Sequence, residues 1–223
     1  MLGVGRKPDS QFFQGTRADW QTLTGAVMER DGHVCQVCGF VSRRFQKIRR
    51  VEGAKGRAAD SWMTICPQCD QCLSLESVAG MRSGTLIWLP EISQVELNHV
   101  TRALLTARTH PSASSELKAA AKAGYDSLLT RRGDAKRRLG TDDPAILACV
   151  MMENMDDAAY AARAAKLEGV RLLPLEQRLI QTPTGPRDQY PALLAWWQDR
   201  EGPFEGFAPS SWAGALQGRV GSA

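Results

Sequence analysis

The sequence lacks a hydrophobic run long enough to cross a membrane. A membrane-spanning helix needs roughly 18 or more consecutive apolar residues, whereas the longest apolar stretch, Gly84–Leu89, has the length of a buried strand. The start of the chain, MLGVGRKPDSQFFQG, also lacks the apolar segment and the cleavage site of a secretory signal. Both absences predict a cytoplasmic protein. In that reducing compartment, clustered cysteines are more often metal ligands than disulfides.

Aromatic residues make up only 7% of the chain, and its two basic clusters lack the repeated aromatic interleaving that stacks on nucleic-acid bases. Both clusters could nevertheless face phosphate. A nucleic-acid-binding module therefore stays open as an alternative to a solvated surface or a contact for an acidic protein. The clusters consist of Arg43, Arg44, Lys47, Arg49, Arg50, Lys55 and Arg57, and of Arg131, Arg132, Lys136, Arg137 and Arg138.

Changes in composition divide the chain into four parts. We expect a flexible leader over residues 1–17, a small module over 18–90, a helical region packed on it over 91–200, and a flexible tail over 201–223. The tail is rich in Gly, Ser and Ala, which favours disorder unless a partner binds it.

Hydrophobic spacing and capping residues predict the elements inside these parts. The module reads as a helix with an Asp19 cap and a Gly32 stop, strands over 45–51 and 62–65, a helix running from the second cysteine group to Val78, and a strand over 85–89. The later region reads as helices after the Ser93 capping box, over 115–130, after Asp143-Pro144, over 158–168 and over 190–200. This pattern predicts an α+β fold with a mainly α-helical C-terminal part.

Two Cys-x-x-Cys pairs, Cys35 with Cys38 and Cys66 with Cys69, carry the strongest chemical signal. Thiolates are soft, strong ligands for zinc, and tetrahedral four-cysteine sites are a common structural kind. Each pair turns two sulfurs to the same side, and Gly39 lets the backbone turn back after the first pair. The segment between the pairs is long enough for a hairpin. The sequence therefore predicts one Zn²⁺ ion bound by these four cysteines.

Cys72 is an alternative ligand, because a residue three positions after Cys69 shares its helix face and could replace Cys66. We favour Cys66, since a sulfur placed before the helix and another at its start suit a knuckle followed by a helix. Cys72 would then be a packed thiol. Cys149, on an apolar helix, is expected in the core.

The order of helix, cysteine pair, hairpin, cysteine pair and helix resembles the zinc-bearing branch of the HNH nuclease fold, a treble-clef-like ββα module. In that family the hairpin carries a general-base histidine, an asparagine precedes the second pair, and a further His or Asn helps to hold a catalytic cation. Here these positions hold Val51–Ala54, Ser61 and Asp70. The three histidines, His33, His99 and His110, lie elsewhere. We therefore expect no catalytic residue, and a residual nuclease remains only an alternative.

A second resemblance is to the IcmJ family, also called DotN, of Dot/Icm type IVB secretion systems and related conjugation systems. The family patterns QCxxxESV, GTLIYLPEL and QAELN follow the cysteines in the same order as Cys72–Val78, Gly84–Ile92 and Val95–Asn98. Further matches are Asp143–Ile146 and Arg171–Pro174, so the resemblance covers about residues 20–200.

This resemblance implies a non-enzymatic, zinc-binding scaffold at the cytoplasmic face of the inner membrane. Members of the family belong to the type IV coupling complex, where they contact the C-terminal extension of the coupling ATPase DotL and lie near the membrane-anchored DotM. Adaptor proteins of that complex recruit effectors. The implied partners are thus a DotL-like segment, a DotM-like protein and effector adaptors.

Trp196 and Trp197 are the candidate partner-binding residues. Tryptophan is over-represented among interface hot spots. Adjacent residues on a helix point in different directions, so we expect one of the two to face outward.

Overall fold

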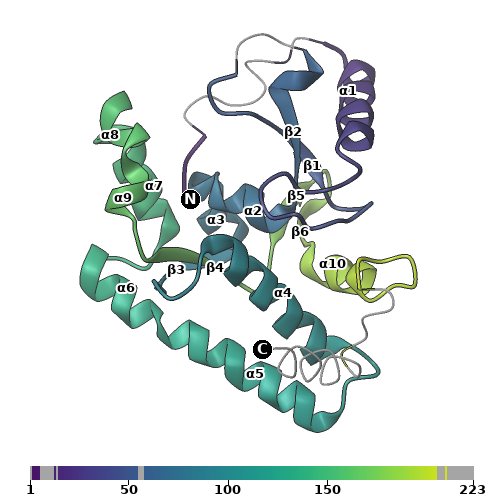
Figure 1. Cartoon of the computed structure of the whole chain (residues 1–223), viewed down its shortest axis with the longest axis vertical. Helices are drawn as coiled ribbons and strands as arrows, with labels where there is room; N and C mark the ends of the chain where they lie inside the picture. The colour runs from purple at the N-terminus through teal and green to yellow at the C-terminus, as the bar shows by residue number, and fades with distance from the viewer. Residues whose placement is uncertain (1, 6–12, 14, 55–57, 205–208, 210–223) are drawn as a thin grey trace, which may run out of the picture.

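The chain combines helices with short antiparallel strands (Figure 1), which confirms the predicted α+β class. The computed structural model describes residues 2–5, 13, 15–54, 58–204 and 209. The helices are α1 (Arg17–Arg30), α2 (Pro67–Cys72), α3 (Leu75–Met81), α4 (Gln94–Thr109), α5 (Ser115–Thr130), α6 (Arg132–Leu139), α7 (Pro144–Glu153), α8 (Asp157–Ala161), α9 (Arg163–Lys166) and α10 (Tyr190–Trp197). The strands are β1 (Lys47–Arg50), β2 (Trp62–Ile65), β3 (Gly84–Trp88), β4 (Val170–Pro174), β5 (Leu179–Thr182) and β6 (Gly185–Asp188).

Helix α1 packs on the β1–β2 hairpin around a small core of its own, which contains Val27, Ile48 and Trp62. The helix starts earlier than predicted. Thr16, rather than Asp19, is the N-cap, and Asp19 completes a capping box because its carboxylate accepts the Thr16 N–H at 2.8 Å. After the hairpin the chain enters α2, so the order of two strands and a helix agrees with the predicted module.

The antiparallel pair β3–β4 separates two hydrophobic cores. Strand side chains alternate between faces, so Leu86 and its register partner Leu172 enter one core while Ile87 and Leu173 enter the other. All four side chains are fully buried. The core with Ile87 also holds Cys35, Cys38, Cys66, Cys69 and the tryptophans of α10, and we call it the cysteine core. The second core holds α3, α7 and Cys72.

Helices α4 and α5 form an antiparallel pair along one edge of the molecule, and α4 also packs on β4 (Figure 1). The predicted Ser93 capping box is confirmed, since Ser93 Oγ accepts from the Glu96 N–H and the Glu96 carboxylate accepts from the Ser93 N–H. Helix α5 has the predicted bounds, and α7 starts after its predicted Asp143 cap. Helix α4 is thereby held between the cysteine core and α5.

The first residues of the expected leader are packed rather than flexible. Leu2 and Val4 are buried in the second core. The backbone of Gly3 accepts from the Leu75 N–H at 3.1 Å and donates to the Cys72 carbonyl at 2.9 Å. Tyr160 Oη both accepts from the Val4 N–H and donates to the Val4 carbonyl, each at 3.0 Å. Residues 2–5 of the expected leader are therefore tied to α3 and α8 by packing and hydrogen bonds.

The region after residue 90 differs from the prediction in three ways. It contains three strands, β4 to β6, in addition to its helices. The helix expected over 158–168 is split into α8 and α9, and the second basic cluster forms an unpredicted helix, α6. Most of the predicted tail, including Phe207 and Trp212, lies outside the described residues. Among the described helices, none combines the length and the hydrophobicity that crossing a membrane requires.

Candidate metal centre

The first cysteine pair lies in a tight knuckle between α1 and β1. The Cys35 N–H donates to the Phe40 carbonyl at 2.9 Å, and the Gly39 N–H donates to the Cys35 carbonyl at 2.8 Å. Gly39 has a φ of +73°, the left-handed conformation that glycine adopts at no steric cost. The knuckle therefore brings Cys35 and Cys38 to one side of the loop, as the sequence predicts.

The second pair uses the start of α2. Cys66 is the N-cap residue, with extended backbone, and Pro67 is the first residue of the helix, where its missing N–H is not needed. The Cys69 N–H donates to Cys66 Sγ at 3.5 Å. The cap position thus places the Cys66 sulfur over the first turn of the helix, beside the Cys69 sulfur.

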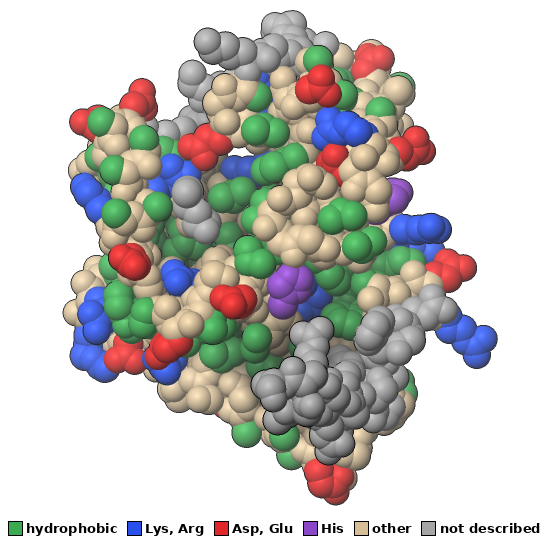
Figure 2. Space-filling model, viewed as in Figure 1, with side chains coloured by type: hydrophobic (Ala, Val, Ile, Leu, Met, Phe, Trp, Pro, Cys, Tyr) green, Lys and Arg blue, Asp and Glu red, His purple; other side chains and the backbone are tan. Residues whose placement is uncertain are grey.

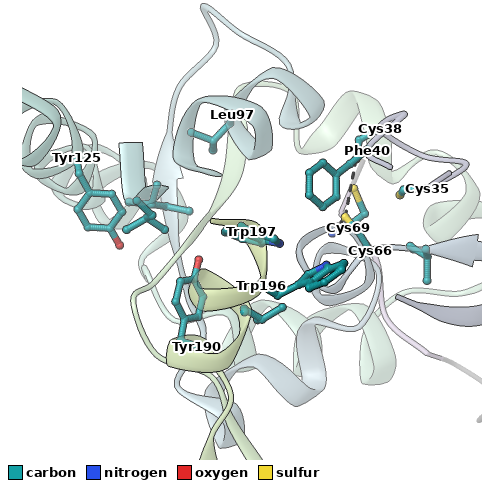
Figure 3. Packing of buried hydrophobic residues seen from close by; sticks show 14 of the residues in the cluster. Cys35, Cys38, Phe40, Cys66, Cys69, Leu97, Tyr125, Tyr190, Trp196 and Trp197 are labelled. Atoms are coloured by element: carbon teal, nitrogen blue, oxygen red, sulfur yellow. Dashed lines mark hydrogen bonds between the residues drawn. The ribbon is translucent and has the colours of Figure 1, made fainter. Parts of the chain in front are cut away.

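These two pairs meet in the cysteine core (Figure 3). The sulfurs of Cys35, Cys38, Cys66 and Cys69 all lie within 4.8 Å of one another, and all four residues are buried. A tetrahedral zinc ion with bonds of about 2.3 Å separates its sulfurs by about 3.8 Å. The distance between Cys38 Sγ and Cys66 Sγ is 3.8 Å. The donor set and its spacing fit one tetrahedral ion of the zinc type.

Hydrogen bonds among the crowded sulfurs also shift their acidity. Contacts with the thiol of Cys38, and then with Cys66 and Cys69, lower the pKa of Cys35 well below its ordinary value. The contact with Cys35 raises the pKa of Cys69. Cysteine binds a metal ion as the thiolate, so a cation at this centre would neutralise the negative charge of its ligands.

Cys72 lies apart from this group. Its sulfur donates to the Gln68 carbonyl at 3.1 Å, on the side of α2 that faces the second core. Burial raises the pKa of Cys72 to about 12, which keeps it a neutral thiol and a poor ligand. Cys72 is thus a packed thiol, as expected, whereas the expectation that Cys149 lies in the core is wrong. Cys149 is exposed on α7 rather than in the core, because Leu147, Ala148 and Met151 form the buried side of that helix.

Helix α4 contacts the cysteines through two buried side chains that the sequence analysis did not single out. Asn98 Nδ2 donates to Cys69 Sγ at 3.4 Å, and Arg102 Nη2 donates to Cys66 Sγ at 3.6 Å. Both residues are only 1% exposed. Helical spacing places both residues on the side of this helix opposite Val100 and Leu104, where the sequence predicts exposed polar residues, so it contains no signal for their burial.

The positions that carry nuclease chemistry in the HNH fold hold ion pairs or backbone contacts here. Glu52 accepts from Arg163 at 3.0 Å, and Asp70 pairs with Lys47 at 2.6 Å and with Arg49 at 3.1 Å. The Ser61 carbonyl accepts from the backbone of the hairpin.

The histidines lie in separate places. His99 Nε2 is 2.8 Å from the Cys38 carbonyl oxygen, and His110 contacts Ser112. His33 lies beside the first pair with a positive φ of 55°. Within the described part of the chain, the residues grouped at metal-binding distance are the four cysteines.

Both Trp196 and Trp197 are buried, so the expectation that one faces outward is wrong. Trp197 packs edge-on against Phe40, with 6.0 Å between ring centroids. Trp196 donates from Nε1 to Ser42 Oγ at 3.0 Å and lies under the guanidinium of Arg44 at 4.5 Å. Adjacent residues can both be buried because α10 packs against the cysteine knuckle on one side and α4 on the other (Figure 3).

No protein-family model matches the chain. The type 4 apparatus protein DotN of Legionella pneumophila subsp. pneumophila (strain Philadelphia 1) is 33% identical over 178 residues, which covers 78% of this chain and 78% of that protein. An identity of this size over most of both chains is evidence of common descent. The chain therefore belongs to the DotN family, which is also called IcmJ.

Proposed function

We propose that this protein is a non-catalytic, zinc-binding scaffold subunit of a type IVB secretion system. In this role it binds the C-terminal extension of a DotL-like coupling ATPase, lies near a DotM-like protein and helps effector adaptors to recruit substrates. It is held at the cytoplasmic face of the inner membrane through these partners. The observation that carries the proposal is the similarity to a type 4 apparatus protein over 78% of the chain.

The composition of the metal centre supports a structural ion rather than a catalytic one. Catalytic zinc sites keep a coordination position open for water, whereas sites with four protein ligands are closed. Four buried sulfurs would fill a tetrahedral ion here. A zinc ion held in this way would contribute folding energy, and the hairpin followed by a helix would be a degenerate HNH-type module that retains the metal and has lost the catalytic histidine.

Helix α7 offers a surface for the ATPase segment. Its buried side packs in the second core, while Ile146 and Val150, one turn apart on its other side, are 52% and 40% exposed. Figure 2 shows apolar side chains on the surface over this part of the molecule. Exposed apolar strips of this kind on a helix are typical of protein contacts. We infer that the apolar side of a helix from the ATPase extension packs on this strip.

A binding assay with the purified ATPase extension tests the proposal. The wild-type protein is expected to bind, and the double variant Ile146→Asp with Val150→Asp is expected to bind at least tenfold more weakly, because charged side chains exclude an apolar partner. Val100→Asp is the matched control, since Val100 is 41% exposed on α4. Absence of binding by a folded, metal-loaded wild-type protein would overturn the scaffold function, while equal binding by the double variant would overturn only the assignment to α7.

A further inference from the structure

Arg102 is a buried cation whose contacts are with the metal centre. Its guanidinium lies 3.7 Å above the Phe40 ring, and its hydrogen bonds go to Cys66 Sγ and to His99 Nδ1, the latter at 3.2 Å. Neither partner is a carboxylate. A buried charge without compensation strongly destabilises a fold. The counter-charge that these contacts offer is that of the thiolates, because four thiolates around a divalent cation carry a net charge of about −2.

Asn98 is held in one orientation by a second contact. Gln94 Nε2 donates to Asn98 Oδ1 at 3.0 Å, which leaves Asn98 Nδ2 pointing to Cys69 Sγ. The same Gln94 amide is paired with the backbone of β4, since its Nε2 donates to the Leu172 carbonyl at 2.9 Å and its Oε1 accepts from the Leu172 N–H at 2.8 Å. A continuous chain of hydrogen bonds thus runs from a metal-centre sulfur through α4 to the β3–β4 sheet.

We propose that Arg102 and Asn98 form the outer coordination sphere of the metal centre, with Arg102 as its counter-charge and Gln94 as the residue that couples it to β4. In this arrangement, metal binding and the docking of α4 on β4 stabilise each other. The proposal gives a physical role to Asn98, which ends the Val95–Asn98 run by which the sequence resembles its family. It rests on the metal part of the proposed function and is independent of the partner.

The first measurement is metal affinity, by competition of the purified full-length protein with a chromophoric zinc chelator. Arg102→Met removes the charge and retains most of the volume, and Asn98→Leu removes the N–H donor. Each is expected to weaken zinc binding by about 10- to 100-fold, the usual effect of losing an outer-sphere partner. Arg102→Lys retains the charge without the planar guanidinium, so its loss should be smaller than that of Arg102→Met.

Arg163→Met is the matched control. Arg163 is also a buried guanidinium over an aromatic ring, 3.9 Å from that of Tyr160, but its charge partner is Glu52 and it lies in the contact network of the second core. This variant is expected to lose thermal stability and to bind zinc within about twofold of the wild type. This control distinguishes the general effect of removing a buried arginine from the specific effect of removing the positive charge beside the metal centre.

A spectroscopic measurement reports on the sulfurs themselves. The protein is loaded with Co²⁺ in place of zinc. A positive charge or an N–H donor near a thiolate lowers the energy of the sulfur electrons, which raises the energy of the sulfur-to-cobalt transition. Loss of Arg102 or Asn98 should therefore move the sulfur-to-cobalt charge-transfer band to longer wavelength, with no movement in Arg163→Met.

Unchanged zinc affinity and an unchanged cobalt spectrum in Asn98→Leu and in the Arg102 variants would overturn the proposal. If Arg102→Met does not fold, Arg102→Lys and Asn98→Leu decide the matter. These assays use the isolated protein, so a failure to bind the ATPase extension leaves them intact. Conversely, unaltered metal affinity in the variants leaves the scaffold function intact.

Discussion

At the scale of the residue, Cys69 and Cys72 show how one helical turn separates a metal-centre residue from a packing residue. Both belong to α2, yet the first faces the cysteine core and the second faces the second core. Cys66 can join Cys69 because it precedes the helix as its cap. Spacing alone allows either Cys66 or Cys72 to complete the set, and the cap geometry brings Cys66 to the group of four sulfurs.

This difference predicts opposite results for two neighbouring substitutions. Cys69→Ser should lose the bound metal, and with it a folding contribution on the order of 10 kcal/mol, which is comparable to the whole stability of a domain. Cys72→Ala should retain one metal ion per chain and lose only about 1 kcal/mol of packing. Elemental analysis and thermal unfolding measure both effects. Metal loss in Cys72→Ala with retention in Cys69→Ser would show that the ligand set is wrong.

The four cysteines could be predicted from the sequence because each pair is encoded locally, by two intervening residues and a following Gly39 or helix. The contacts of Asn98 and Arg102 could not, because they depend on where α4 lies relative to α2. By helical spacing both residues lie on the polar side of α4, where the sequence alone predicts exposure to solvent. The same limit applies to Trp196, whose hydrogen bond to Ser42 joins residues far apart in the chain.

At the scale of the element, local sequence signals predict where helices begin and end, but they do not predict how the helices pack. The Ser93 capping box and the Asp143-Pro144 start were predicted, since caps act on adjacent backbone amides. The helix expected to run from α2 to Val78 is instead broken at Leu73, so that the Leu75 N–H is free to bond the Gly3 carbonyl. That break reflects a contact with the start of the chain, and no pattern within α2 and α3 encodes it.

The packing of the chain start predicts a measurable role for Tyr160. Tyr160→Phe leaves the N–H and the carbonyl of Val4 without their hydrogen-bond partner and should destabilise the fold by about 2 kcal/mol. Tyr125→Phe, which loses one bond to the Pro174 carbonyl, should lose about half as much. Thermal unfolding gives the stabilities, and hydrogen exchange at the Val4 amide should accelerate only in the first variant. Unchanged exchange at Val4 would contradict this contact.

At the scale of the whole molecule, one hydrophobic core joins residues from both sides of the boundary predicted at residue 90. The cysteine core combines the four cysteines with residues of β3, α4, β4 and α10. The sheet that divides the two cores pairs β3 with β4, and six helices, α4 to α9, lie between these two strands in the sequence. Because β4 is short and its partner is remote, its pairing leaves no local signal in the sequence.

The distribution of charge predicts that the protein binds DNA weakly. In the first basic cluster Lys47 and Arg49 are paired with Asp70, while Lys55 and Arg57 lie outside the described residues. In the second cluster Arg132 pairs with Asp142 at 2.7 Å and Arg137 pairs with Asp134. When a protein binds DNA, each basic side chain that neutralises a phosphate releases counterions from the DNA. A basic side chain that is already paired with a carboxylate contributes little to this release.

Titration of duplex DNA at several salt concentrations tests this. The wild-type protein is expected to show a slope of log affinity against log salt of magnitude below about 2, which corresponds to about two phosphate contacts. Asp134→Asn together with Asp142→Asn should strengthen binding and steepen the slope, because the substitutions release Arg137 and Arg132 from their partners. Tight, steeply salt-dependent binding by the wild type would favour the nucleic-acid function over the scaffold. Failure of the double variant to strengthen binding would show that ion pairing does not limit it.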